Sequence, residues 1–264
     1  MKILFSLLFI WVSIFSYTQN YKFVYSLDAR LDSISSAFDL SENMVLFYDH
    51  NQKSSYFVSE NKLKRDSIEI LVRSGSISKM EAMANVSNYP RTYFDFRVFK
   101  NLNNETVRTI DEIMIVLYEY KENLNFDWKI QNDTLTISNL KCRKATTNYA
   151  GRNYTAWYTD EILIPEGPYK FKGLPGLIVK LYDDTESYVF TLTQAARYND
   201  LIMEYHPKKL VQTSFKDFYT MRKDFYNNPI PTLESFGSRM SPEMKKHTRE
   251  RYKMFNNFIE IKPD

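Results

Sequence analysis

The stretch that decides the fold of this chain is GPYKFKGLPGLIV, residues 167–179. The chain of 264 residues has six glycines and nine prolines, and three of the glycines and two of the prolines fall in this stretch. Glycine is needed where the backbone angle φ is positive or where a side chain would collide with an approaching backbone. Proline fixes φ at about −65°. Together they predict a rigid, irregular path with little conformational freedom.

Pro175 and Gly176 suit the two central positions of a type II β-turn. The neighbouring Leu174, Leu177 and Ile178 are apolar, so we expect this turn to pack against the core and lead into a strand. A phosphate-binding role is disfavoured, because the Gly-x-x-Gly spacing lacks the lysine and Ser/Thr of a P-loop.

The sequence on both sides of this stretch alternates polar and apolar residues, as half-buried strands do. Residues 177–198 predict a β-hairpin with DDTES as its turn. Upstream, strand-like segments separated by polar turns recur about every 8–12 residues, which favours an antiparallel meander. These segments are 21–32, 42–51, 54–61, 91–100, 106–111, 112–122, 125–130, 134–149 and 154–162.

Helical spacing predicts a helix within residues 60–87, with a break at Gly75, and further helices at 214–229 and 241–261. In the last of these, Ser241 is the expected N-cap and Pro242 the first helical residue. One apolar stripe is expected there, formed by Met244, Tyr252, Phe255 and Ile259. We therefore predict an α+β fold: a predominantly antiparallel β-sheet, a meander compatible with a curved half-barrel, with one helical segment in the first half and helices at the C-terminus.

The N-terminus predicts export. Lys2 precedes an apolar run over residues 3–15, and small residues follow it, as in a secretory signal peptide. The run is shorter than the roughly 20 apolar residues that span a bilayer. We expect residues 1–19 to be a signal peptide and residues 20–264 to form a single α+β domain without a further transmembrane segment.

The cysteine content and the net charge limit where the protein is expected and which partners it is expected to bind. No cysteine lies near the expected cleavage site, so we predict a periplasmic, outer-membrane-associated or secreted protein that is not a lipoprotein. The formal charge of 35 − 32 = +3 is too balanced to indicate nucleic acid as a partner. Cys142 is the only cysteine, which excludes an internal disulfide, and we expect it to be a small core residue.

The histidines do not predict a metal site. His50, His206 and His247 are scattered and lack the spacing of metal ligands. No catalytic motif accompanies them, so we predict no metal, no cofactor and no assigned catalytic residue.

Two pairs of carboxylates could serve glycoside hydrolysis: Asp160 with Glu161, and Asp183 with Asp184. The second pair falls in the expected hairpin turn, where aspartate is favoured for local hydrogen bonds. A structural role is therefore the favoured interpretation of that pair.

Arg152 and Trp157 lie shortly before the rigid turn and are the candidate binding residues. A guanidinium and an indole side by side could offer a ligand one charged and one flat contact. The favoured alternative is that Arg152 hydrogen-bonds the carbonyl groups of the turn while Trp157 fills the core.

Residues 140–184 closely resemble the signature of the GLPGLI family, exported proteins typical of Bacteroidetes. The matching positions are Cys142, Lys144, Ala145, Thr146, Gly151, Arg152, Ala156, Trp157, Gly167, Pro168, Gly173, Leu174, Pro175, Gly176, Leu177 and Ile178. The resemblance implies a location outside the cytoplasm, and it implies no reaction.

Three functions remain open. The first is a non-enzymatic cell-envelope protein that binds a partner, such as another envelope or outer-membrane protein, or an apolar ligand in a cavity between the sheet and the C-terminal helices, as carrier-like half-barrels do. The second is a secreted hydrolase acting on glycan or peptide, with Asp160 or Glu166 close to Arg152. The third is a structural subunit of an envelope complex. We favour the first.

Overall fold

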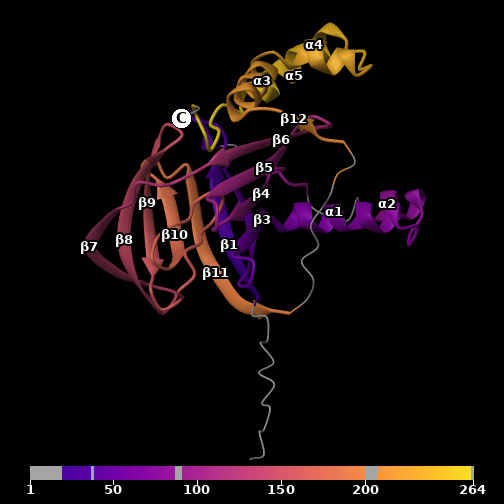
Figure 1. Ribbon diagram of the computed structural model, residues 1–264. Coiled ribbons are helices and arrows are strands. Elements are labelled where there is room, and N and C mark those ends of the chain that lie inside the picture. The colour runs from indigo at the N-terminus through magenta and orange to yellow at the C-terminus, as the bar shows by residue number, and fades with distance from the viewer. Residues whose placement is uncertain (1–19, 37–38, 87–90, 200–206, 208, 263–264) are drawn as a thin grey trace, which may run out of the picture.

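The computed structural model describes residues 20–36, 39–86, 91–199, 207 and 209–262 (Figure 1). Within them lies one open sheet of twelve strands, in the spatial order β12-β6-β5-β4-β3-β2-β1-β11-β10-β9-β8-β7. Neighbouring strands are antiparallel, except for β12 and β6, which are parallel. The expected signal peptide, residues 1–19, lies outside the described residues.

The strands are β1 (Asn20–Arg30), β2 (Asp39–Asp49), β3 (Ser54–Ser59), β4 (Arg97–Asn101), β5 (Thr106–Ile113), β6 (Val116–Asn123), β7 (Lys129–Ile137), β8 (Leu140–Tyr149), β9 (Arg152–Thr159), β10 (Leu177–Asp183), β11 (Tyr188–Tyr198) and β12 (Val211–Gln212). The helices are α1 (Glu60–Arg73), α2 (Lys79–Val86), α3 (Phe215–Asn227), α4 (Pro229–Ser235) and α5 (Pro242–Lys253).

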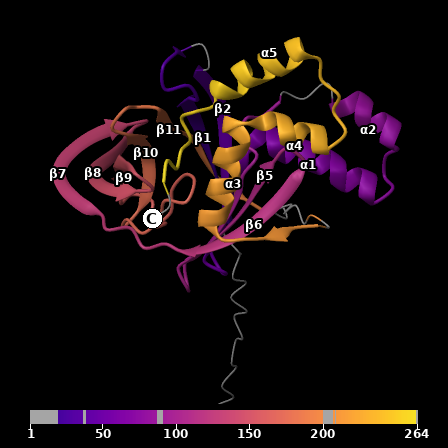
Figure 2. The ribbon, with the colours of Figure 1, turned by 90° about the horizontal axis from the view of Figure 1, so that it is seen from above.

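Two meanders make up the sheet. Strands β1 to β6 form one and β7 to β11 the other, and the antiparallel pair β1–β11 joins them, with Asn20 opposite Tyr198. The sheet curves around a hollow side without closing (Figure 2). The predicted α+β fold, with its mostly antiparallel sheet, is confirmed.

The hollow side of the sheet carries the main core. Successive residues of a strand point to opposite faces, and Phe23, Tyr25 and Leu27 of β1 are almost completely buried on this side. The high aromatic content of the chain serves this core, because each buried ring removes a large apolar area from water. Fully burying one such side chain contributes about 1.5–3 kcal/mol.

Two turns differ from the sequence prediction. Residues 112–122 do not form one strand, because the chain reverses at Met114, whose φ is 61°. Residues 131–133 do not form a turn and instead belong to β7; the turn into β8 comes at Ser138 and Asn139, with φ of 49° and 65°. Neither turn contains glycine or proline, the residues that mark such positions most clearly.

The helical segment of the first half forms two helices. Ser59 caps α1, its side chain accepting a hydrogen bond from the backbone nitrogen of Lys62 at 3.1 Å. The helix ends just before Gly75, whose φ is 76°, so the predicted break is confirmed. Through Leu63, α1 packs on the outer face of the sheet, opposite the hollow side.

The start of α5 agrees with the prediction, and its end does not. Ser241 accepts a hydrogen bond from the backbone nitrogen of Met244, and Pro242 is the first helical residue. The helix ends at Lys253, however, and contains no buried residue, so the expected stripe does not continue to Ile259. Among the described residues, no helix combines the length and apolar character needed to span a bilayer.

Residues 254–262, here called the C-terminal strap, leave α5 and return to the hollow side of the sheet (Figure 2). The backbone nitrogen of Asn257 donates to the carbonyl oxygen of Leu31 at 3.1 Å, and that of Ile261 donates to Ala150 at 3.0 Å. These hydrogen bonds explain the early end of α5, because they hold the chain in an irregular, extended path against the sheet.

Candidate functional site

Residues 160–176, between β9 and β10, fill the hollow of the sheet and are here called the motif plug. A β-bridge joins Glu166 to Lys172 inside it. Tyr169 and Phe171 are 2% and 0% exposed. The expectation that this segment packs into the core is confirmed.

The turn at the end of the motif plug is not of type II. The backbone nitrogen of Gly176 donates to the carbonyl oxygen of Leu174 at 2.7 Å, which makes a tight three-residue turn around Pro175. A Cβ atom on residue 176 would lie 2.0 Å from the carbonyl oxygen of Thr159. Glycine is required here because two backbones approach each other closely.

Buried ions anchor the motif plug to the sheet. Lys100 on β4 pairs with Glu166 at 2.5 Å and donates to the carbonyl oxygens of Gly167 and Phe171 at 2.7 and 3.2 Å. Ser55 on β3 donates to Glu166 at 2.8 Å. Burial lowers the pKa of Lys100, and the charge of Glu166 opposes that shift. Each polar group is satisfied from within the fold, which indicates a structural role.

A second buried ion pair ties the motif plug to the C-terminal strap. Lys170 contacts Glu260 of the strap and Glu122 of β6, both at 2.6 Å, and Tyr149 donates to Glu260 at 2.5 Å. Lys170 and Glu260 are 0% exposed. The strap is therefore part of the core.

The two candidate binding residues do not come together. Arg152 is buried on the hollow side, where it donates to Asp183 at 2.8 Å, to the Asn257 side chain at 2.5 Å and to the Phe258 carbonyl oxygen at 2.7 Å. Trp157, five positions along β9, lies half-buried on the opposite face. Arg152 thus binds the hairpin and the strap, and not the carbonyl groups of the motif turn.

Several other residues of the sequence signature are small and leave room for neighbouring segments. Ala145 and Ala156 are fully buried and face each other across β8 and β9. Gly151 has a φ of 87°, and a Cβ there would lie 2.7 Å from Ile261 of the strap. Cys142 is buried, as expected, and burial raises its pKa to about 11. These signature residues therefore allow the motif plug and the C-terminal strap to pack closely against the sheet.

The carboxylates considered for hydrolysis lie apart. Asp160 and Glu161 are exposed. Asp183 is buried and accepts from the backbone nitrogen of Tyr188 at 2.7 Å, as predicted for a hairpin aspartate. Since Glu166 and Arg152 occupy separate ion pairs, these groups do not converge on one pocket.

The histidines are equally dispersed. His50 and His247 are exposed, and His206 lies outside the described residues. In the described part of the chain, no three His, Cys, Asp or Glu side chains form a group that could hold a metal ion.

Among the described residues, no large apolar cavity lies between the sheet and the C-terminal helices, so the comparison with carrier-like half-barrels was wrong. The motif plug and the strap fill that space. The cavity that remains there measures about 80 Å³, and charged and aromatic side chains line it.

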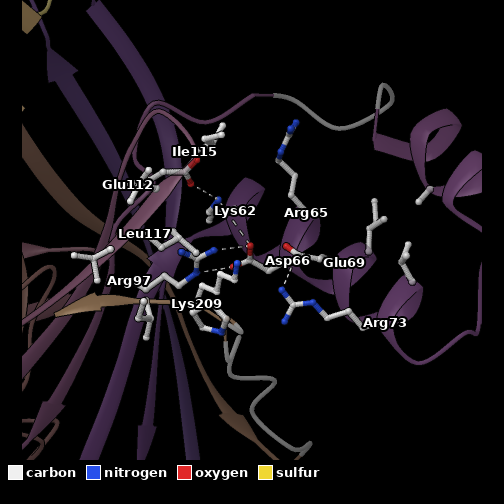
Figure 3. Close-up of a pocket in the computed structure, with 17 residues that line it drawn as sticks. Lys62, Arg65, Asp66, Glu69, Arg73, Arg97, Glu112, Ile115, Leu117 and Lys209 are labelled. Carbon is white, nitrogen blue, oxygen red and sulfur yellow. Dashed lines mark hydrogen bonds and ion pairs between the residues drawn. The ribbon is translucent and has the colours of Figure 1, made fainter. Parts of the chain in front are cut away.

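A much larger groove, of about 1430 Å³, lies on the outer face of the sheet, between α1 and the β5–β6 turn (Figure 3). Its base holds a buried ion pair: Arg97 on β4 donates to both carboxylate oxygens of Asp66 on α1 at 2.7 Å. Lys62, one helical turn before Asp66, reaches Glu112 at 3.4 Å and so links α1 to β5. These contacts fix the width of the groove.

The groove lining carries an excess of positive charge. It contains five cations and three carboxylates, a net charge of 5 − 3 = +2: Lys62, Arg65, Arg73, Arg97 and Lys209 against Asp66, Glu69 and Glu112. The carboxylates are all paired, Glu69 with Arg73 one turn along the helix. Arg65 and Lys209 have no ion-pair partner among the described residues, and Figure 3 shows Arg65 extending away from Asp66.

Apolar side chains share this groove. Ile115 of the β5–β6 turn is 71% exposed, and Val211 of β12 is 46% exposed. Ile68 and Val72 of α1 also line it. Exposed apolar groups gathered in one concavity, beside unpaired charged side chains, are typical of an interaction site.

The sequence did not reveal this groove. Ile68 and Val72 stand four residues apart on α1, and an apolar side of this kind is by itself typical of core packing. The opposite wall comes from the turn at Met114 and Ile115, where the sequence pattern predicted a continuous strand.

No curated protein matches the sequence. Two crystal forms of PNGF-II, in space groups P21 and C2, share the fold, with TM-scores of 0.53 and 0.52 and 14% and 15% identity. They cover 78% of this chain, which spans about a third (33% and 32%) of the PNGF-II chain. Residues 148–180, which contain the motif plug, match the family described as "Protein of unknown function (Porph_ging)".

Proposed function

We propose that this chain is an exported, non-catalytic binding domain of the cell envelope, and that its outer groove takes an acidic, partly apolar polypeptide segment of another envelope protein. The proposal treats residues 20–264 as one domain. Its location rests on the expected signal peptide.

The observation that carries the proposal is the unbalanced chemistry of the groove. Arg65 and Lys209 offer positive charge without a described partner, beside the exposed apolar side chains of Ile115 and Val211. An acidic segment with apolar side chains complements both features, because it neutralises the cations and covers the apolar surface.

The positions of the carboxylates favour a binding role over an enzymatic one. The carboxylates on which the hydrolase alternative depends are dispersed or hold the motif plug in place. The same fold makes up about a third of a longer chain in PNGF-II, where it stands beside further sequence. A module that works next to another protein region fits both observations.

Direct binding tests the groove. Two sets of labelled twelve-residue peptides share the same apolar residues, with Glu and Asp in one set and Lys in the other. We expect the acidic set to bind, more weakly as salt rises, and the Arg65→Glu/Lys209→Glu variant to lose at least about tenfold in affinity. Lys246→Glu/Arg249→Glu on α5 is the matched control, because it removes the same charge elsewhere.

Equal binding of both peptide sets, no binding of either set, or an equal effect of the two variants would contradict the proposal. Cell fractionation tests the location separately: the protein is expected in the envelope or the medium, and recovery from the cytoplasm would refute export.

A further inference from the structure

A pocket separate from the outer groove lies between α3, the last turn of α5 and the C-terminal strap. It measures about 290 Å³. Because a water molecule takes up about 30 Å³ in the liquid, the pocket has room for about ten of them, which is enough for a small organic molecule with one ring. One face of α3 forms a wall, since Tyr219, Lys223, Tyr226 and Asn227 stand at helical spacing. We call this space the aromatic pocket.

Aromatic rings make up much of the lining. Tyr226 is at the centre of the cluster. Its ring centre lies 5.6 Å from that of Tyr252, 5.8 Å from that of Phe255 and 5.1 Å from that of Phe258. The planes of these three pairs meet at 56°, 56° and 72°, so the rings are tilted against one another and not stacked. A flat ligand ring can add to such a cluster in the same edge-to-face geometry.

The hydrogen-bond acceptors around the pocket are already in use. The Ile261 carbonyl oxygen accepts from the hydroxyl group of Tyr219. The Lys253 carbonyl oxygen accepts from Nδ2 of Asn256 at 3.0 Å, and Oδ1 of Asn256 accepts from the backbone nitrogen of Ser33 at 2.8 Å. A ligand that only donates hydrogen bonds therefore finds few partners here.

Hydrogen-bond donors, in contrast, remain free at the same place. Lys223 and Lys253 are exposed side chains of the lining, and neither has an ion-pair partner among the described residues. The Tyr252 hydroxyl group and the Asn227 side-chain amide likewise make no hydrogen bond within the described part of the chain. The described lining residues include no carboxylate, so their formal charge is 2 − 0 = +2. Free donors and positive charge beside aromatic walls suit a ligand that joins a flat ring to an anionic acceptor.

We propose that the aromatic pocket binds a small aromatic carboxylate. The carboxylate accepts hydrogen bonds from the ammonium groups of Lys223 and Lys253 at the mouth, and the ring lies among Tyr226, Tyr252 and Phe255. A neutral ring would leave both ammonium groups without a counter-charge, and acetate would leave the aromatic walls uncovered. The site uses other elements than the outer groove and does not depend on the peptide binding proposed there.

Fluorine NMR with labelled probes tests the proposal on residues 20–264. The probes are 4-fluorophenylacetate and its neutral amide, 4-fluorophenylacetamide, which share the ring and differ in charge. We expect saturable line broadening with the acid and an affinity about tenfold lower for the amide, since the amide lacks the charge-assisted hydrogen bonds. Unlabelled phenylacetate should displace the acid, whereas acetate at the same concentration should not, because it lacks the ring.

Variants locate the binding. Lys223→Gln/Lys253→Gln should weaken binding of the acid about tenfold or more and leave that of the amide unchanged, since both cations are lost. Both side chains are exposed, so the fold is not at risk. Lys216→Gln/Lys246→Gln is the matched control: it removes two exposed lysines from the same two helices, outside the pocket lining, and should bind the acid as the wild type does. Tyr252→Ala removes part of a wall and should weaken both probes.

Four results would overturn the proposal: no saturable binding of the acid, equal affinity for acid and amide, an equal effect of the two lysine pairs, or displacement by acetate as effective as displacement by phenylacetate. The last of these would indicate a site for simple anions. Arg65→Glu/Lys209→Glu, which tests the outer groove, should leave the fluorine signals unchanged. The two binding proposals can therefore fail separately.

Discussion

Lys100 on β4 and Glu166 in the motif plug form an ion pair of 2.5 Å in which both side chains are completely shielded from solvent. The pair joins residues far apart in the chain, at the place where the plug enters the hollow of the sheet. Removing two charges from water is costly, and hydrogen bonds from Ser55 and to Gly167 offset that cost here.

Breaking this pair should destabilise the fold strongly. Glu166→Gln leaves the Lys100 ammonium buried without a counter-charge, and we expect a loss of about 3–5 kcal/mol in the free energy of unfolding. Lys100→Met/Glu166→Met should recover part of that loss. Urea unfolding followed by tryptophan fluorescence measures both.

Asp160→Asn is the control for this pair, since Asp160 is an exposed carboxylate of the same plug and should change stability by less than about 0.5 kcal/mol. If Glu166→Gln and Asp160→Asn unfold at the same urea concentration, the pair does not hold the plug.

Two glycines of the motif should respond differently to alanine. At Gly176 the new Cβ would lie 2.0 Å from the Thr159 carbonyl oxygen, so both backbones must move, and we expect a loss of more than about 4 kcal/mol or no folding. At Gly173, where φ is 91° and no atom lies within 4 Å of the added Cβ, only backbone strain of about 1–2 kcal/mol is expected. Thermal unfolding followed by circular dichroism compares them, and equal melting temperatures would contradict the close approach.

Asp111 should make stability depend on pH. Burial raises its pKa from 3.8 to about 6, although Arg222 opposes the shift. The folded protein therefore holds this proton more tightly than the unfolded chain does, and the contribution of Asp111 to stability is lost as the pH rises through the folded pKa. Between about pH 4 and 7, the stability of Asp111→Asn should increase by about 2 kcal/mol relative to the wild type.

Chemical denaturation at several pH values measures this difference. A stability difference between variant and wild type that stays constant with pH would show that the Asp111 carboxyl titrates alike in both states.

Cys142 should be unreactive in the folded protein. It is 1% exposed, and burial raises the pKa of its thiol to about 11, so little thiolate is present near neutral pH. Iodoacetamide should label it only after unfolding in denaturant, as mass spectrometry can follow. Rapid labelling of the native protein would place the thiol at the surface.

Local sequence patterns were sufficient to predict much of the fold. The DDTES hairpin turn follows from Asp and Ser between two alternating segments, and the start of α5 from Ser241 followed by Pro242, because these signals act over a few neighbouring residues. The turn at Met114 carries no such local signal. A non-glycine residue adopts a positive φ there, and the neighbouring residues do not indicate it.

Such local patterns do not predict contacts between distant segments of the chain. Arg152 was a candidate binding residue, and its partners Asn257 and Phe258 belong to the strap, about a hundred positions later. The outer groove likewise needs elements from separate parts of the chain, and spacing within one segment does not indicate which of them meet.

The pairing of β1 with β11 constrains the order in which the parts of this protein can fold. The first strand after the expected signal peptide lies at the centre of the sheet, with Asn20 opposite Tyr198. During synthesis or translocation, one edge of β1 therefore stays open until most of the chain has emerged. Such non-local pairing folds slowly and leaves an unpaired edge that can bind other strands. We expect a holding chaperone to raise the yield of the native protein, most of all before residues 188–198 are available.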